Sequence, residues 1–290
     1  MRFIVGYTDT PAGRDALALG VRMARARGAR LEIVLVLASE HRATLVPASP
    51  SYDRYVEELA EQWLAKARSR VPEDVDADTH IVHADSLAEG LLDASRDLEG
   101  SMIVVGGASD GIRGRYTIGT VSRALLHSAV VPVALAPRGI RKLETTKLSR
   151  VTAAVGTRAG AEQLLDAAIL AASGAAVPLR LLSLVTLDRR ADPAEVARTA
   201  AEEHAATVRD YARRHLPDGT DVEVVIATGT RVEDAVASVV WDPEEIVLVG
   251  SSRLAASGHL FLGTTAAKML RELPVPMVVV PRESVLTIEG

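Results

Sequence analysis

The chain has 290 residues, no cysteine and a formal net charge of −5. Without cysteine, disulfides, thiolate catalysis and cysteine-ligated metals are excluded, and the acidic balance gives no basic footprint for nucleic acid or for an anionic membrane. Aromatic residues make up only 3% of the chain, which disfavours base-stacking surfaces, while 48% hydrophobic residues suffice for two cores. No segment reads as a signal peptide or a membrane span, so we expect a cytoplasmic protein.

The first 138 residues predict a regular alternation of strands and helices. Short runs of β-branched residues indicate strands, and apolar residues at helical spacing indicate the helices between them. The predicted strands cover residues 3–6, 31–37, 79–82, 102–105 and 131–136, and the longer helices cover 53–70 and 119–127. On helix 53–70 we expect Tyr55, Val56, Leu59 and Trp63 to share one face.

Residues 139–149, rich in Lys, Thr and Arg, predict a linker that joins two domains, 1–138 and 150–290, without fixing their geometry. The second domain repeats the order of the first. Its predicted strands cover residues 151–155, 179–185, 222–226, 246–249 and 275–280, and its predicted helices cover 161–173, 193–215 and 264–271.

The two halves also repeat in detail, at an offset of 144 residues. Residues 104–106, 118–120 and 131–133 return in similar form as 248–250, 262–264 and 275–277. A solenoid unit spans roughly 20 to 50 residues, so each copy here is a whole domain. The capping-box spacing of Ser86 and Glu89 recurs at the same offset as Thr230 and Glu233, which predicts the same helix start in both copies.

Five strands alternating with four helices predict an α/β fold. We expect two tandem open, twisted, mainly parallel five-stranded sheets of Rossmann-like type, with helices on both faces. In such sheets a ligand binds beyond the carboxyl ends of the strands, at the switch point in strand order. The apolar last strands, 131–136 and 275–280, are edges that need cover.

The loop after the fourth strand carries glycines at the same spacing in both copies. The first copy reads Gly106-Gly107-Ala108-Ser109, nine further residues, then Gly119-Thr120, and the second reads Gly250-Ser251-Ser252-Arg253, nine further residues, then Gly263-Thr264. This spacing resembles the Gly-x2-Gly-x9-Gly-(Ser/Thr) motif of nucleotide-binding members of the universal stress protein family, in its tandem two-domain form. The resemblance covers the whole chain, and it implies an adenine nucleotide alpha hydrolase-like fold with ATP and Mg²⁺ as the candidate ligand.

Both copies depart from this motif at the second glycine, which is replaced by Ser109 and by Arg253. A side chain there makes a positive φ, or a close approach to a ligand, less accessible. ATP-binding members of the family usually carry an Asp just after the first strand, where this chain has Thr8 followed by Asp9. We therefore expect a better site in the first copy than in the second.

The helix that begins near Gly119 presents unpaired N–H groups and a partial positive charge, which favour a phosphate. The resemblance also implies that Val36 packs on the base. The expected contacts of the first site are Thr8, Val36, Gly106, Ser109, Gly119, Thr120, Val121 and Ser122, and those of a weaker second site are Gly250, Arg253, Gly263 and Thr264. The alternative is that Gly119 and Thr120 only start a helix.

Two functions follow. The first is a stress-associated regulator or sensor that binds nucleotide in the first domain; the second is an interaction scaffold with both pockets degenerate. We expect no enzyme, because the chain has no Walker lysine and no serine elbow, although weak ATPase activity is left open. Family members pair through the last strand, which implies an intrachain pseudo-dimer and a homodimer as partner.

Other candidate groups are weaker. His80 and His83 should leave opposite faces of a strand, so no shared metal site is expected. Asp9 and Asp15 lie near the end of the first strand, and a helix-start role is the preferred interpretation for both.

Overall fold

The structure is a computed structural model of the chain. It describes residues 1–39, 50–107, 119–143, 145, 147–155, 162–186, 221–252 and 260–281, with isolated helical positions between 199 and 214. The first half contains β1 (Arg2–Gly6), α1 (Pro11–Arg27), β2 (Arg30–Ala38), α2 (Pro50–Arg68), β3 (Ala77–Ala84), α3 (Leu87–Asp97), β4 (Met102–Gly106), α4 (Thr120–Ser128) and β5 (Val133–Ala136). A short 3-10 helix, η1 (Ile140–Lys142), follows.

The second half repeats this order. It contains β6 (Val151–Ala154), α5 (Glu162–Ala175), β7 (Leu179–Thr186), β8 (Val222–Gly229), α7 (Val232–Ala237), β9 (Ile246–Gly250), α8 (Thr264–Glu272) and β10 (Met277–Val280). The helix predicted for 193–215 lies largely outside the described residues. Within the described parts of the chain, no helix is both long and apolar enough to cross a lipid bilayer.

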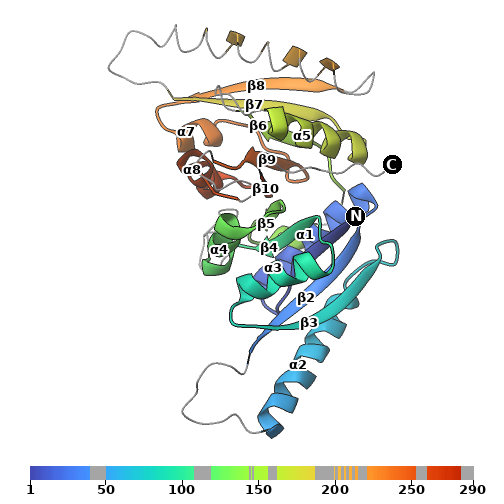
Figure 1. The fold of residues 1–290 in the computed structure, drawn as a ribbon. Coiled ribbons are helices and arrows are strands. Elements are labelled where there is room, and N and C mark those ends of the chain that lie inside the picture. Colours follow the sequence, from blue (N-terminus) through green and yellow to red (C-terminus); the bar gives the residue numbers. More distant parts are fainter. Residues whose placement is uncertain are drawn as a thin grey trace.

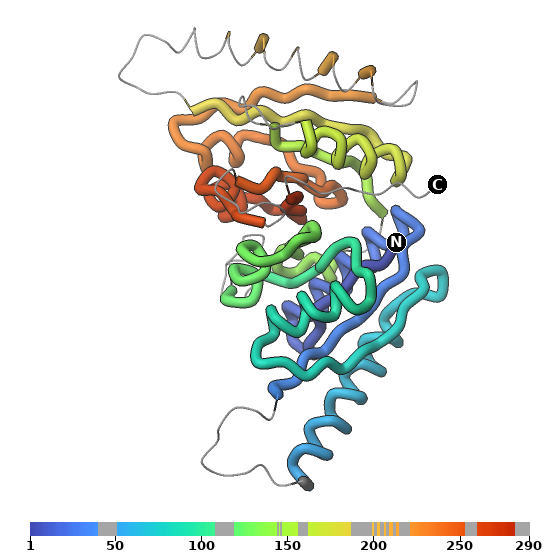
Figure 2. Tube along the Cα trace, viewed as in Figure 1, coloured from blue at the N-terminus to red at the C-terminus, as the bar shows by residue number. Residues whose placement is uncertain are grey.

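The ten strands form one sheet in the order β3-β2-β1-β4-β5-β10-β9-β6-β7-β8 (Figure 1). Strand pairs within each half are parallel, whereas β5 and β10 pair antiparallel, with Val278 opposite Ala134. The α/β prediction is confirmed, and the two apolar edge strands cover each other. In Figure 2 the two halves meet at this seam, where the green and dark red parts of the tube lie side by side.

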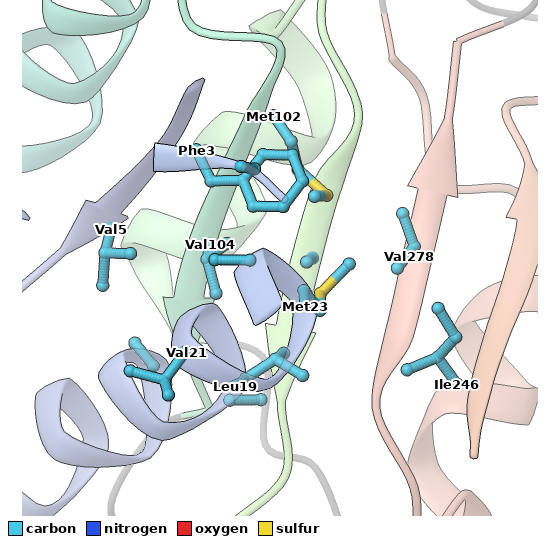
Figure 3. Packing of buried hydrophobic residues seen from close by; sticks show 14 of the residues in the cluster. Phe3, Val5, Leu19, Val21, Met23, Met102, Val104, Ile246 and Val278 are labelled. Carbon is cyan, nitrogen blue, oxygen red and sulfur yellow. The ribbon is translucent and has the colours of Figure 1, made fainter. Parts of the chain in front are cut away.

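Two apolar layers cover the two faces of the sheet, and each layer runs through both halves. One layer joins α1, α2 and α5 to one face, through residues such as Leu19, Leu64 and Leu165. Figure 3 shows part of it around Val21 and Val104. The other layer joins α3, α4, α7 and α8 to the opposite face. Because alternate strand residues point to opposite faces, a buried parallel sheet needs apolar residues at nearly every position.

The linker does not leave the geometry open, contrary to the prediction. Asp15, buried in α1, accepts hydrogen bonds from the backbone N–H groups of Gly139 (2.9 Å) and Arg141 (3.1 Å), and its carboxylate pairs with the Arg141 guanidinium at 2.8 Å. Arg22, also buried in α1, donates to the carbonyl oxygens of Thr145 (3.0 Å) and Pro243 (3.1 Å). Asp15 therefore holds the linker against α1, a role that the helix-start interpretation missed.

Two local predictions need correction. On α2, Tyr55 is 61% exposed, because the buried side of the helix runs through Ala60, Leu64 and Ala67, about one position further along. The helix start predicted at Thr230 is displaced by one residue, since Arg231 is the N-cap of α7. Asp234, and not Glu233, accepts from the Arg231 backbone N–H at 3.1 Å.

Candidate functional site

A hollow opens at the carboxyl ends of β1 and β4, where the strand order changes direction. These strands are neighbours in the sheet, but the chain leaves β1 for α1 on one face and β4 for α4 on the other. The hollow encloses about 500 Å³ counted out to its open mouth. Its walls come from Gly6, Tyr7, Thr8, Ala12, Gly13, Val34, Val36, Leu87, Leu91, Val105, Gly106, Val121 and Ser122. This is where open α/β sheets bind ligands.

The hollow brings together five of the eight residues expected for the first site. They are Thr8, Val36, Gly106, Val121 and Ser122. Gly119 and Thr120 do not line it, but they lie at the start of α4, directly before two residues that do. Ser109 lies outside the described residues. Gly13 also lines the hollow and was not predicted from the sequence. A glycine in the first turn of a helix was the signal that could have pointed to it.

Two glycines in the wall are required by packing. A Cβ on Gly106 would lie 2.1 Å from the carbonyl oxygen of Ala12, and one on Gly13 would lie 2.1 Å from the carbonyl oxygen of Thr8. Real Cβ atoms do not approach backbone this closely, so both glycines let the start of α1 press against the ends of β1 and β4. Gly106 thus has a structural role even before any ligand binds.

The start of α4 faces the opening without a side-chain cap. Its N-cap, Gly119, is extended (φ −70°, ψ 168°) and supplies no capping oxygen. The helix therefore keeps the unpaired N–H groups and partial positive charge that attract anions. Ser122 in its first turn is only 4% exposed, and its hydroxyl forms no hydrogen bond with any residue that the structure describes.

Thr8 is held in the wall by a chain of hydroxyl groups. Its Oγ1 lies 2.9 Å from the Oγ1 of Thr10, which accepts a hydrogen bond from the backbone N–H of Gly13 at 3.2 Å and so caps α1. A ligand at this wall would meet the hydroxyl of Thr8, not a carboxylate.

Asp9 does not supply the missing acid. Its Oδ1 accepts from the Nε of Arg14 at 2.9 Å and from the hydroxyl of Tyr7 at 3.2 Å, while Lys66 and Arg70 lie 3.7 Å away. Burial alone would raise the pKa of the Asp9 carboxyl, but these hydrogen bonds and positive charges outweigh it and lower the pKa. Burial raises the pKa of the Tyr7 hydroxyl. Asp9 is thus a paired anion outside the lining of the hollow.

In the second half, described residues on either side of the loop after β9 are hydrogen-bonded to each other. The hydroxyl of Ser251 accepts from the backbone N–H of Phe261 at 2.8 Å, and the N–H of Ser252 donates to the carbonyl oxygen of Phe261 at 2.8 Å. The same segment is tied to the first half, since the N–H of Leu260 donates to the carbonyl oxygen of Ala129 at 2.9 Å. The Phe261 ring also meets His127 edge-on at 4.8 Å.

The residues expected for the second site are placed accordingly. Gly263 is the N-cap of α8 and Thr264 begins it, with a Cβ on Gly263 lying 3.3 Å from that of Ser252. A Cβ on Gly250 would meet only ordinary contacts at 3.8 Å. Arg253 lies outside the described residues, and the position that corresponds to Ser122 is occupied by Ala266.

A buried charged cluster in the second half was not predicted from the sequence. Arg180 donates to Glu245 at 2.8 Å, Thr152 donates to the same carboxylate at 2.6 Å, and the guanidinium stacks 4.9 Å from the centre of the Trp241 ring. In the first half the position of Arg180 is taken by Glu32, which lies 2.7 Å from His80. His80 is thereby bound to an acid on the next strand, while His83 is exposed. Both clusters stabilise ends of strands and do not line the hollow.

These features define a class of protein: two Rossmann-like α/β units joined edge to edge, with an open hollow at the switch point of the first. The profile of the Universal stress protein family matches residues 1–137 and 147–281. The chain therefore belongs to the universal stress protein family, in a tandem arrangement.

Relatives of the same length exist in mycobacteria. A universal stress protein of Mycobacterium tuberculosis (strain H37Rv) is 30% identical over 293 residues, covering 97% of this chain and 100% of the relative. A universal stress protein of Mycobacterium bovis has the same identity and coverage.

Solved structures share the fold. A universal stress protein from Archaeoglobus fulgidus superposes with a TM-score of 0.69 at 18% identity, covering 97% of this chain and 98% of that one. A putative universal stress protein from Pseudomonas aeruginosa gives a TM-score of 0.57 at 16% identity, covering 97% and 92%. At these identities the likeness concerns the fold alone.

Proposed function

We propose that the first half binds an adenine nucleotide in the switch-point hollow, and that the protein acts as a stress-associated regulator or sensor and not as an enzyme. The observation that carries this proposal is the pairing of an apolar wall with an uncapped helix start in one hollow. Val34 and Val36 offer β-branched surface for a base, while α4 and the hydroxyl of Ser122 offer donors for phosphate. A cytoplasmic location stays a prediction from the sequence.

The described walls also bear on Mg²⁺. None of the described residues that line the hollow is a carboxylate, and the nearby Asp9 is paired with Arg14. A hard cation such as Mg²⁺ prefers oxygen ligands and is often carried by the phosphates themselves. The residues present thus fit Mg²⁺ as a companion of the nucleotide, with the hydroxyls of Thr120 and Ser122 as side-chain oxygens in the first turn of α4. When bound, the ion would neutralise phosphate charge.

Titration calorimetry with ATP and Mg²⁺ tests the proposal. Ser122→Ala should weaken binding roughly tenfold or more, because a hydrogen bond to a charged group is lost. Ser128→Ala, an exposed change at the far end of the same helix, is the matched control and should bind like the wild type. Gly119→Trp should abolish binding while the protein stays folded, since the φ of Gly119 suits any residue, whereas Gly263→Trp should leave the affinity unchanged.

A second candidate function has its own support. The clasp between Ser251, Ser252 and Phe261 uses the second copy's loop for contacts within the chain, which favours an interaction scaffold in that half. If both pockets are degenerate, wild-type protein will give no binding heat at millimolar ATP. The variant Thr8→Asp then distinguishes a degenerate pocket from an intact pocket that binds another ligand. It introduces the acid that the family resemblance implies for ATP binding, so it should create ATP binding only if the rest of the site is intact. A homodimer remains a proposal, to be tested by sedimentation.

A further inference from the structure

A second cavity lies between the two halves, far from the switch-point hollow. It opens on the face of the sheet covered by α1 and α5, and encloses about 720 Å³ counted out to its mouth. Its walls include Phe3, Met23 and Met102 from the first half, and Ile246, Leu248 and Val278 from the second. Figure 3 shows the side chains of Met23 and Met102 on one side of this space and those of Ile246 and Val278 on the other.

The walls are almost wholly apolar. Of the sixteen residues that line the cavity, only Arg27 and Ser101 have polar side chains. The hydroxyl of Ser101 is already engaged, since it donates to the carbonyl oxygen of Arg2 at 2.9 Å. A cavity of this chemistry does not hold water well and favours an apolar occupant.

Arg27 gives the cavity one cationic end. It ends α1 and donates through one N–H group to the carbonyl oxygen of Leu170 in α5, while it forms no ion pair with any carboxylate that the structure describes. Burial lowers the pKa of its guanidinium, with no acid opposing the shift. A Cβ on Gly174 would lie 1.5 Å from its nitrogen, so glycine at this helical position makes room for the guanidinium. The guanidinium thus lies directly over the backbone of α5 at Gly174.

We propose that this cavity binds a single-chain amphiphile with one carboxylate, such as a medium-chain fatty acid, with its alkyl chain between the halves and its carboxylate on Arg27. A guanidinium has five N–H donors and matches a carboxylate in a two-point geometry, so it can accept this partner while keeping its bond to Leu170. Charge complementarity selects the anionic head group, and the apolar walls select the chain. The site is separate from the nucleotide hollow and does not depend on the proposed function.

The first test uses the wild-type protein with methyl-labelled methionine and dodecanoate as the probe. The chain has five methionines, and Met23 and Met102 line the cavity, whereas Met269 and Met277 are buried in the layer on the opposite face. Saturable shifts in the NMR signals of Met23 and Met102, with Met269 and Met277 unmoved, are expected. Shifts at all of them alike, or none up to the solubility limit of dodecanoate, would overturn the proposal.

Calorimetry with variants tests the head group and the chain separately. Arg27→Met should weaken dodecanoate binding at least about tenfold and leave dodecanol binding within about twofold, since only the charged hydrogen bonds are lost. Ala171→Phe, which fills the cavity, should abolish binding of both probes. Arg68→Met and Ala65→Phe on the exposed side of α2 are the matched controls and should change neither affinity. Wild-type affinity for dodecanoate in Arg27→Met would refute the assigned head-group contact.

Discussion

Adding one methyl group at Gly106 and at Gly250 should have opposite consequences, although the two glycines occupy the same place in the repeat. A Cβ on Gly106 meets the backbone oxygen of Ala12 at 2.1 Å, while a Cβ on Gly250 meets only the side chain of Leu164 at 3.8 Å. The first contact is more than 1 Å too close and involves backbone, so α1 must move away from β4. The second is an ordinary van der Waals contact.

The size of the effect follows from these distances. Overpacking a well-packed site costs typically about 1 to 3 kcal/mol, and a clash with backbone belongs at the upper end, so Gly106→Ala should lose about 3 kcal/mol. Gly250→Ala should be neutral or stabilise by up to about 1 kcal/mol, because it restricts the unfolded chain at no steric cost. Since about 1 kcal/mol moves the midpoint of thermal unfolding by about 2 to 4 °C in proteins of 150 to 250 residues, circular dichroism melts will separate the two variants.

Gly106→Ala and Gly250→Ala proteins that lose the same stability would contradict this prediction. Equal losses would mean that Gly106 is not a packing glycine and that its place in the motif reflects the ligand alone. A Gly106→Ala protein that melts like the wild type but no longer binds ATP would also show that Gly106 serves the ligand and not the packing.

Three further predictions concern charged groups. Arg180→Met should lower the free energy of unfolding in urea by about 1.5 to 3 kcal/mol, because the fully buried carboxylate of Glu245 loses one of its two guanidinium partners and keeps Arg150 at 3.2 Å. Asp15→Asn should cost about 1 to 3 kcal/mol and speed tryptic cleavage of the linker, since Asp15 is the acceptor that holds it. Asp9→Asn should destabilise the protein at neutral pH and lose this effect in acid. The lowered pKa of Asp9 means that its stabilisation is present above its ordinary value of 3.8 and disappears as pH falls through the folded-state pKa.

Each of these has an opposing result. An Arg180→Met protein as stable as the wild type would show that Arg150 and Thr152 alone satisfy the Glu245 carboxylate, and an Asp15→Asn linker that resists trypsin would show that other contacts hold it. A stability difference between Asp9→Asn and wild type that persists unchanged to pH 2 would contradict an ion-pair role for Asp9.

The fold was largely predictable because its signals are local and repeated. Apolar runs such as 102–105 and 246–249 predict buried parallel strands. Because the repeat has an offset of 144 residues, a strand predicted in one copy also predicts a strand in the other. The pairing of the two last strands followed from their apolar character together with the family resemblance, whereas its antiparallel direction was not predicted. Positions on helices were less certain: one step of rotation placed Tyr55 in solvent.

What the sequence could not reveal depends on contacts between distant residues. The bond from Asp15 to the linker spans 124 residues, and the pairing of Arg180 with Glu245 spans 65, so neither has a local pattern. The motif pointed to Gly106 as a ligand residue, whereas its packing role appears only once Ala12 is placed beside it. The sequence shows that Ser122 corresponds to Ala266 in the second half. Only the structure shows that Ser122 lines the hollow.

Binding of an adenine nucleotide by the first half can be tested on the wild-type protein. The most direct measurement purifies the protein without added nucleotide, denatures it, and identifies and counts any released small molecule by chromatography and mass spectrometry, with ATP titration of the emptied protein alongside. We expect one adenine nucleotide site per chain, seen either as released nucleotide or as saturable binding that Gly119→Trp removes and Gly263→Trp preserves. An empty protein that gives no binding heat at millimolar ATP would contradict it.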